Sequence, residues 1–355
     1  MDIKAFLKAL SEASGVSGYE DQVREIVRQE FARYADEVRT DAMGNVIALV
    51  RSTPDEGAPR RSIMLAGHMD EIGLMVTVVD KGFLRFTTVG GFDVRTLLGQ
   101  QVVVHGSRDL PGIIGARPPH VLPEEERDKV VPLDDLLIDV GLSEGEVSSL
   151  VKAGDFVTIQ RPVVELQRDY LAGKGFDDRA AVAAIADCLA RLVTMHRRWD
   201  VYAVATVQEE VGLKGAVTSA YGLAPDVGVA IDVGFGRQAG LSEAESIEMG
   251  KGPAIAFGPN IHPKMYEKLV EVAKANELPY QIEAAPGPTG TDARAIQVAR
   301  EGIPTALLSI PLRNMHTAVE TLSVKDVERT GRLLAAFIVA LNEDFAQVLG
   351  LPTRQ

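Results

Sequence analysis

The first part of the chain alternates between helical and extended patterns of apolar residues. Residues Ile3, Phe6, Leu7 and Leu10 recur at helical spacing, whereas Ser62–Gly67 is a continuous apolar run, typical of a strand buried on both faces. The patterns predict helices over 2–13 and 20–35, strands over 37–41, 45–51 and 62–67, and a polar loop over 51–61. This order of elements indicates an α/β domain.

A different pattern begins after Gly73, where short β-type runs divided by glycine replace the helical spacing. These runs cover residues 74–79, 83–89, 101–105, 112–116 and 155–159. The acidic stretch 122–135 is expected to be an exposed loop or a short helix. Many short strands at this spacing predict a small β-barrel or sandwich inserted into the α/β domain.

The α/β alternation returns after residue 163. It predicts helices over 179–195, 262–275, 292–299 and 323–348, a short helix beginning near Lys214, and strands over 199–205, 227–232, 280–283 and 304–310. The chain is therefore divided into a first α/β part over 1–68, a β insertion over 69–164 and a second α/β part over 165–355.

The composition narrows the classes of partner and compartment. A chain of 355 residues with 46% hydrophobic and 25% charged residues is ordinary for a soluble protein of about two domains. The net charge of -13 argues against nucleic acid or an anionic membrane as partner. The single cysteine, Cys188, excludes an internal disulfide and lies in an apolar helical pattern, which favours a buried thiol. Without a signal-peptide pattern or an 18-residue apolar run, a cytoplasmic location is expected.

Five segments place ligand-type residues directly after a buried strand or a glycine turn. They are Gly67-His68-Met69-Asp70, Gly175-Phe176-Asp177-Asp178-Arg179, Gln208-Glu209-Glu210, Ile231-Asp232 and Met315-His316-Thr317. Functional groups of open α/β sheets gather at the carboxyl ends of strands, so distant segments can converge there. Two histidines with several carboxylates suit Zn²⁺, Co²⁺ or Mn²⁺ better than Ca²⁺. They exceed the needs of one tetrahedral zinc ion, which favours two metal ions sharing a carboxylate.

Each of these candidates also has an ordinary structural explanation. Glu209 and Glu210 can be a solvated pair in a loop, although neighbouring side chains at a strand end point apart and can serve different roles. The remaining alternatives are hydrogen-bonded core histidines for His68 and His316, a helix cap for Asp177 and Asp178, and a turn for Asp232. The joint occurrence of all five segments in one α/β chain favours the metal site.

Together the segments resemble the M42 family of metalloaminopeptidases, the glutamyl aminopeptidase and tetrahedral (TET) aminopeptidase group. The segments that carry the resemblance are Gly67–Gly73, Asp177–Arg179, Gln208–Leu213, Gly290–Ala293 and Asn314–Thr317, with Leu98–Gln100 and Gly115–His120 similar to the family's inserted dimerisation domain. The resemblance covers essentially the whole chain. It implies a mixed-sheet co-catalytic metallopeptidase domain with helices on both faces, plus an inserted barrel-like domain.

The resemblance implies a role for each site residue. Asp177 bridges two divalent ions, His68 and Asp232 complete one site, and Glu210 and His316 complete the other. Asp70 orients the His68 imidazole, as imidazole ligands generally require. Glu209 is the general base of a metal-dependent aminopeptidase, in which two cations ~3.5–4 Å apart acidify a water and polarise the scissile carbonyl of a short peptide. The Asp177–Asp178 peptide is implied to be cis.

Two further residues are candidates for substrate binding. Gly290-Thr291-Asp292 is expected to line the cleft, with Asp292 near the substrate amine, although Thr291 or Asp292 can instead cap the following helix. Arg237 lies in the loop after Asp232 and can favour an acidic first residue, or it can be a solvated arginine. Many relatives have Thr and a small polar turn after the equivalent of Asp232, so no side-chain preference is transferred from them.

The resemblance also implies self-association: dimers through the inserted domain and tetrahedral dodecamers with interior active sites. Three other functions remain open from the sequence. The first is a related metal-dependent deacylase or carboxypeptidase-like hydrolase, and the second is a glycoside hydrolase, which two adjacent glutamates and a single tryptophan disfavour. The third, a non-catalytic shell, would require a missing ligand or base, and none is missing.

Overall fold

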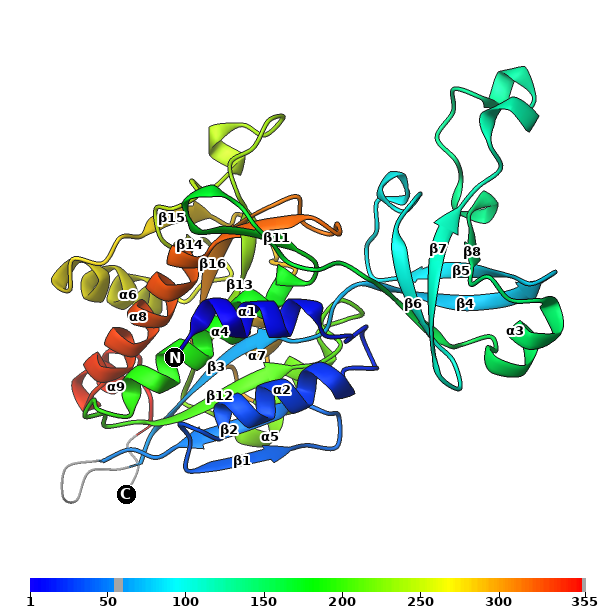
Figure 1. Ribbon diagram of the computed structural model, residues 1–355. Coiled ribbons are helices and arrows are strands. Elements are labelled where there is room, and N and C mark those ends of the chain that lie inside the picture. The colour runs from blue at the N-terminus through cyan, green and yellow to red at the C-terminus, as the bar shows by residue number, and fades with distance from the viewer. Residues whose placement is uncertain (54–59, 353–355) are drawn as a thin grey trace.

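The computed structural model describes residues 1–53 and 60–352. A large α/β body and a small β-barrel lie side by side, and two segments of the chain connect them (Figure 1). Most of the polar loop expected over 51–61, namely residues 54–59, lies outside the described residues. The two architectures occupy the parts of the chain where the hydrophobic pattern changes.

The body is built on one mixed sheet of eleven strands. In spatial order its main path is β1 (Glu37–Thr40), β2 (Val46–Val50), β12 (Asp200–Thr206), β3 (Ser62–His68), β13 (Val227–Phe235), β16 (Thr305–Arg313), β17 (Glu320–Ser323), β11 (Tyr170–Gly173) and β10 (Val164–Glu165), with β14 (Ala254–Phe257) and β15 (Gln281–Ala284) branching from β16. The central strands β12, β3, β13 and β16 are parallel, so their carboxyl ends meet at one edge.

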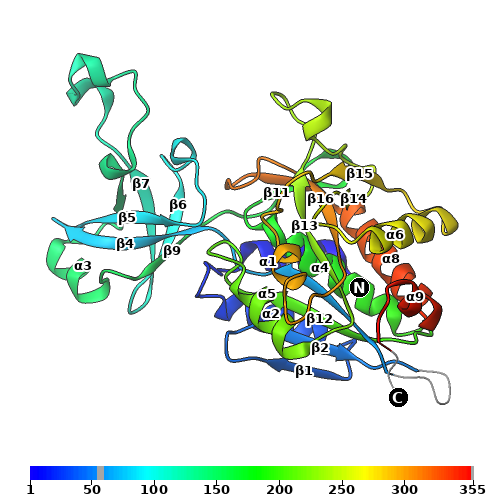
Figure 2. The same cartoon turned by 180° about the vertical axis from the view of Figure 1, so that it is seen from behind.

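Helices cover both faces of this sheet, as the family resemblance implied (Figures 1 and 2). One face carries α1 (Ile3–Glu12), α2 (Asp21–Phe31), α4 (Phe176–Leu192), α6 (Pro263–Ala275), α8 (Val324–Ala340) and α9 (Glu343–Val348), and the other carries α5 (Lys214–Leu223) and α7 (Asp292–Ile296). Alternation along β3 supplies both cores, because Ile63 and Leu65 pack on the first face and Met64 and Ala66 on the second.

The inserted part is a closed antiparallel barrel with its own core. Its strands follow the order β4 (Gly73–Asp80), β5 (Phe83–Val89), β8 (Leu137–Asp139), β7 (Asp109–Gly115), β6 (Gln101–His105) and β9 (Phe156–Ile159), and α3 (Glu144–Leu150) lies beside it. Leu74, Val104, Ile138 and Val157 are fully buried inside. The barrel alternative of the sequence prediction is confirmed, and closure removes the exposed strand edges.

Several element boundaries differ from the sequence prediction. The single helix expected over 323–348 is two helices, because α8 ends at Ala340 and Asn342 caps α9 by accepting the Phe345 N–H at 2.9 Å. The apolar pattern continues across the break through the buried Leu341 and Phe345, so periodicity alone did not reveal it. Strands β8, β10, β11, β14 and β17 and helix α3 were not predicted.

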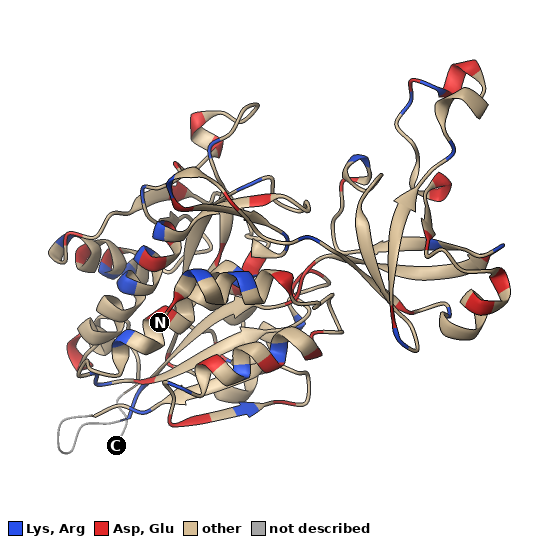
Figure 3. Ribbon diagram, viewed as in Figure 1, with Lys and Arg blue, Asp and Glu red and all other residues tan. Residues whose placement is uncertain are grey.

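The distribution of charged residues, the apolar character of the helices and the position of the single cysteine can be compared with the sequence analysis. Acidic and basic residues are interspersed over the body and the barrel (Figure 3). None of the helices in the described ranges is long and apolar enough to cross a membrane. Cys188 is fully buried in α4, as its apolar surroundings predicted.

Candidate metal centre

The parallel strands bring three of the predicted segments to the same edge of the sheet. His68 ends β3, Glu209 and Glu210 follow β12, and Asp232 lies near the end of β13. The register of β12 and β3 sets Thr206 opposite His68, so the turn after β12 begins level with that imidazole. Residues far apart in sequence therefore meet for a topological reason.

The start of α4 reaches this edge because Gly67 has no side chain. A Cβ at this position would lie 2.7 Å from the Ala181 Cβ and 3.2 Å from Asp178 Oδ2. The helix thus packs directly on β3, and Asp178 Oδ2 accepts the His68 backbone N–H at 3.2 Å. The Asp177–Asp178 peptide is cis, as the family resemblance implied.

Asp177 lies between the two imidazoles. Its Oδ1 is 3.2 Å from His68 Nε2, and its Oδ2 is 3.3 Å from His316 Nε2. His316 Nε2 is in turn 3.5 Å from Glu210 Oε1. One carboxylate therefore faces both histidines from opposite oxygens, the arrangement a shared ligand requires.

Two overlapping groups of donor atoms are close enough to hold ions. One comprises His68, Asp177 and Glu210, and the other comprises His68, Glu209 and Asp232, with the donor atoms of each group within 4.8 Å of one another. The structure thus brings together all five predicted ligands and Glu209. It also places Glu209 in a possible ligand group, which the sequence-based division of roles did not include.

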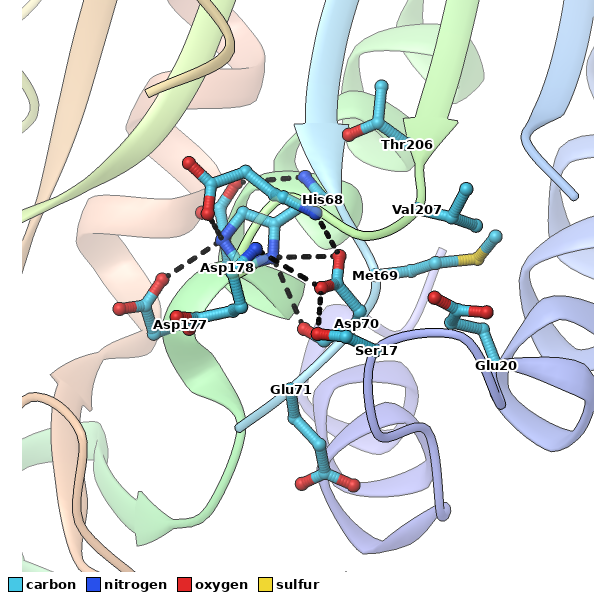
Figure 4. Close-up of polar contacts among 12 residues, drawn as sticks. Ser17, Glu20, His68, Met69, Asp70, Glu71, Asp177, Asp178, Thr206 and Val207 are labelled. Atoms are coloured by element: carbon cyan, nitrogen blue, oxygen red, sulfur yellow. Dashed lines mark hydrogen bonds and ion pairs between the residues drawn. The ribbon is translucent and has the colours of Figure 1, made fainter. Parts of the chain in front are cut away.

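Asp70 lies on the side of the His68 ring opposite to Asp177 (Figure 4). It is fully buried, its Oδ1 is 3.5 Å from His68 Nδ1, and its backbone carbonyl is 3.2 Å from the same nitrogen. Its carboxylate also accepts the backbone N–H groups of Glu209 at 3.1 Å and Glu210 at 3.3 Å, and the Ser17 hydroxyl at 2.6 Å. Asp70 therefore fixes both the imidazole and the turn that carries the glutamate pair.

The electrostatics of the cluster fit bound cations. Burial, reinforced by Asp232, Asp292 and Glu210, raises the pKa of Glu209 to about 9, and burial with Asp177 raises the pKa of Asp232 well above its usual range. Glu209 Oε1 has no hydrogen-bond partner among the described residues. Buried carboxylates at this density require positive charge to ionise together, and the nitrogen and oxygen donors suit Zn²⁺, Co²⁺ or Mn²⁺.

A cavity of about 350 Å³ opens over the cluster. Its described lining includes the five candidate ligands and Glu209, and none of that lining is lysine or arginine. Val233, Phe235 and Leu307 give it an apolar part, and Thr289, Gly290 and Thr291 form one wall. The cavity joins the candidate metal site to space for a small ligand.

The two predicted substrate residues are not part of the described cavity lining. Asp292 is 2% exposed and accepts the Thr206 hydroxyl at 2.6 Å, whereas its neighbour Thr291 lines the cavity. Arg237 is ion-paired with Glu243 at 2.5 Å near the surface and is not part of the cavity lining. Neither side chain is part of the described cavity lining, although Asp292 lies close enough to the cluster to help raise the pKa of Glu209. Substrate binding by Asp292 or Arg237 therefore stays a prediction.

Sequence analysis missed a carboxylate that connects two candidate ligands. Glu320 is 2% exposed, and its oxygens accept the backbone N–H of Asp177 at 3.1 Å and of His316 at 3.0 Å. His316 has a φ of 60°, in the left-handed region, so this hydrogen bond helps to hold an uncommon conformation. The available signal was an acid inside the buried run Glu320–Ser323.

A second missed group lies below the site. Glu71 points away from His68 (Figure 4) and binds Lys174 Nζ with both oxygens at 2.7 Å. Arg179, which is fully buried, lies 3.3 Å from Glu71 and donates to the carbonyl of Met69 at 3.0 Å. This ionic cluster ties the start of α4 to the segment after β3.

Comparisons with known proteins find relatives that match over most of the chain. A family model described as M42 glutamyl aminopeptidase matches residues 44–333. The lysyl aminopeptidase of Pyrococcus furiosus is 38% identical over 341 residues, which cover 94% of this chain and 96% of that protein. A TET aminopeptidase from a marine sediment Thaumarchaeota archaeon has a TM-score of 0.91 at 36% identity, with 98% of each chain covered.

A further solved structure bears on assembly. The TET1 peptidase of Pyrococcus horikoshii, described as able to assemble into a tetrahedron or a large octahedral shell, has a TM-score of 0.83 at 35% identity. The alignment covers 96% of this chain and 100% of that one.

Proposed function

The chain belongs to the M42 glutamyl aminopeptidase family, and on this premise we propose that it removes N-terminal residues from short peptides in a metal-dependent reaction. The observation that supports this most strongly is the position of Asp177 between His68 and His316, with Glu209 beside them in the same cavity. A cluster of this kind combines ligands for metal ions with a carboxylate that can transfer protons.

The proposal keeps the ligand assignment that the family resemblance implied, and the contacts of Asp177 with His68 and His316 support it. Asp177 would be shared, His68 and Asp232 would complete one site, and Glu210 and His316 would complete the other. Two divalent cations held there would supply Lewis-acid polarisation of the scissile carbonyl and lower the pKa of the attacking water. Zn²⁺, Co²⁺ and Mn²⁺ all fit this donor set.

Glu209 would act as the general base. It is 8% exposed, its Oε2 lies 3.8 Å from His68 Nε2, and its Oε1 is free of hydrogen bonds to described residues. It can therefore accept a proton from the attacking water and deliver it to the leaving amine, a role that contributes roughly 10²–10⁴-fold. Asp70 and Glu320 would act as positioning residues, because they hold the backbone and the imidazoles rather than the reacting atoms.

A substrate panel tests this proposal. Protein loaded with Zn²⁺, Co²⁺ or Mn²⁺ is expected to hydrolyse aminoacyl-p-nitroanilides and to lose activity on treatment with a chelator. Matched N-acetylated substrates are the control, because an aminopeptidase requires a free amine. Release of acetate from the acetylated compounds, without release of p-nitroaniline from the free-amine substrates, would identify a deacylase. Hydrolysis of a cellulose substrate that survives chelation would identify a glycosidase.

We also propose that residues 69–164 mediate self-association. Apolar residues Ile113, Val121 and Val130 are exposed on this part of the chain and are candidates for the contact surface. The related TET1 peptidase can assemble into a tetrahedron or a large octahedral shell, and an assembly of this kind with interior active sites would restrict access to peptides. Light scattering on the purified protein is expected to give a dimer or a dodecamer, and a stable monomer would contradict the proposal.

A further inference from the structure

One carboxylate in the cavity has no part in the mechanism above. Glu283, on β15, lines the cavity together with the candidate ligands. Its Oε2 accepts a hydrogen bond from Ser309 Oγ at 2.5 Å. Ser309 lies on β16, directly opposite Asp232 on the neighbouring strand β13. The hydrogen bond to Ser309 therefore holds the Glu283 carboxylate close to the strand that carries Asp232.

This carboxylate has no cationic partner among the described side chains. The described lining of the cavity contains no lysine or arginine, and Glu283 forms no ion pair with the described residues. Burial raises its pKa, and the hydrogen bond from Ser309 opposes that rise. A partly buried acid without a counter-ion is stabilised in its ionised form when a cation binds next to it.

The cavity in front of Glu283, of about 350 Å³, leaves room for such a cation. The rest of the lining includes apolar side chains, among them Val233, Phe235 and Leu307. An occupant that combines an aliphatic stem with a cationic end matches this chemistry, because the stem buries apolar surface while the end meets the carboxylate.

We propose that Glu283 selects peptides whose first residue is lysine or arginine. The proposal rests on the proposed aminopeptidase function, since the first side chain must enter this cavity when the scissile bond lies at the metal cluster. The ammonium or guanidinium group binds the Glu283 carboxylate, and the aliphatic stem packs on the apolar lining. The acidic preference considered for Arg237 is thereby reversed, because Arg237 is engaged with Glu243 outside the cavity.

A competing role for Glu283 is to bind the α-amine of the substrate. Every aminopeptidase substrate carries that amine, so its loss would weaken all substrates equally. A specificity role instead weakens only the substrates with a basic side chain. The two roles are separated by comparing lysine with norleucine, which has a similar aliphatic stem without the ammonium group.

The experiment uses full-length, metal-loaded enzyme and p-nitroanilides of lysine, arginine, norleucine and glutamate. The variant is Glu283→Gln, whose amide oxygen can still accept the Ser309 hydrogen bond. The control is Glu248→Gln, which removes one negative charge at an exposed position outside the cavity. We expect wild-type kcat/KM to favour lysine over norleucine by about 10- to 100-fold, the range of a charged hydrogen bond.

In Glu283→Gln this preference should disappear while norleucine hydrolysis stays unchanged, which also shows that the variant is folded. Glu248→Gln should behave as wild type. A lysine preference that survives Glu283→Gln would overturn the inference, as would an equal loss on all substrates or a wild-type preference for norleucine or glutamate. Those outcomes leave the aminopeptidase function standing, whereas wild-type enzyme that cleaves none of the four substrates would overturn both.

Discussion

Replacing Glu209 with glutamine tests the assignment of the proton-transfer residue. The substitution removes the charge and keeps the shape of the side chain. Glu209 Oε1 makes no hydrogen bond to described residues, and Oε2 lies 3.8 Å from His68 Nε2, beyond hydrogen-bond distance. The backbone N–H at this position would still donate to Asp70 Oδ1 at 3.1 Å. We therefore expect E209Q to fold and to retain its metal ions.

The expected cost is confined to the chemical step. General-base catalysis contributes roughly 10²–10⁴-fold, which corresponds to about 3–5 kcal/mol of activation free energy. The loss should appear in kcat with KM nearly unchanged. The assay measures both constants under saturating Zn²⁺ or Co²⁺, with metal content determined on the same sample.

Glu210→Ala is the matched comparison, because Glu210 Oε1 lies 3.5 Å from His316 Nε2 and belongs to a group of candidate ligands. This variant should lose metal as well as activity. Equal metal loss in E209Q and E210A would refute the division of labour and make Glu209 a ligand, in line with its proximity to His68 and Asp232. A kcat of E209Q within about tenfold of wild type would also refute the general-base role.

Three further predictions concern other positions of the α/β body. Glu320→Ala should weaken metal binding about 10- to 100-fold, because its carboxylate holds the backbone N–H groups of Asp177 and His316; a Zn²⁺ titration against a competing chelator measures this, and an unchanged affinity would exclude the positioning role. Gly67→Ala should lower the free energy of unfolding by about 1–3 kcal/mol, because the new methyl would lie 2.7 Å from a Cβ of α4; a urea titration without loss of stability would show that α4 moves freely. Burial raises the pKa of the Cys188 thiol well above its usual range, so a thiol reagent should label it only after denaturation, and rapid labelling of the native protein would contradict its buried position.

Much of the site was predictable because its residues follow buried strands. His68, Glu209 and Glu210 come directly after apolar runs, and parallel strands carry such residues to one edge of a sheet. The barrel was predictable because glycine-divided β runs replaced the helical spacing after Gly73. In both cases the order of apolar, polar and glycine residues in a short segment was enough to predict the structure.

Other features depend on partners distant in sequence. Glu320 matters because its carboxylate accepts hydrogen bonds from the backbone of two segments, and an acid in a buried run does not by itself indicate these partners. Glu283 enters the cavity because β15 joins the sheet through β14, a strand that was not predicted. Arg237 was assigned to the substrate pocket from its position after Asp232, but its side chain pairs with Glu243 and is not part of the described cavity lining. The positions of these three side chains depend on contacts between separate segments of the chain, which local propensity does not predict.

The central claim is that five side chains on separate elements hold a pair of divalent ions, with Asp177 shared between them. Metal analysis of the chelator-stripped protein after reconstitution with Zn²⁺, followed by removal of free metal, tests it most directly. The account predicts two ions per chain in the wild type and a loss of both from Asp177→Ala. One ion per chain, or a wild-type metal content in Asp177→Ala, would contradict it.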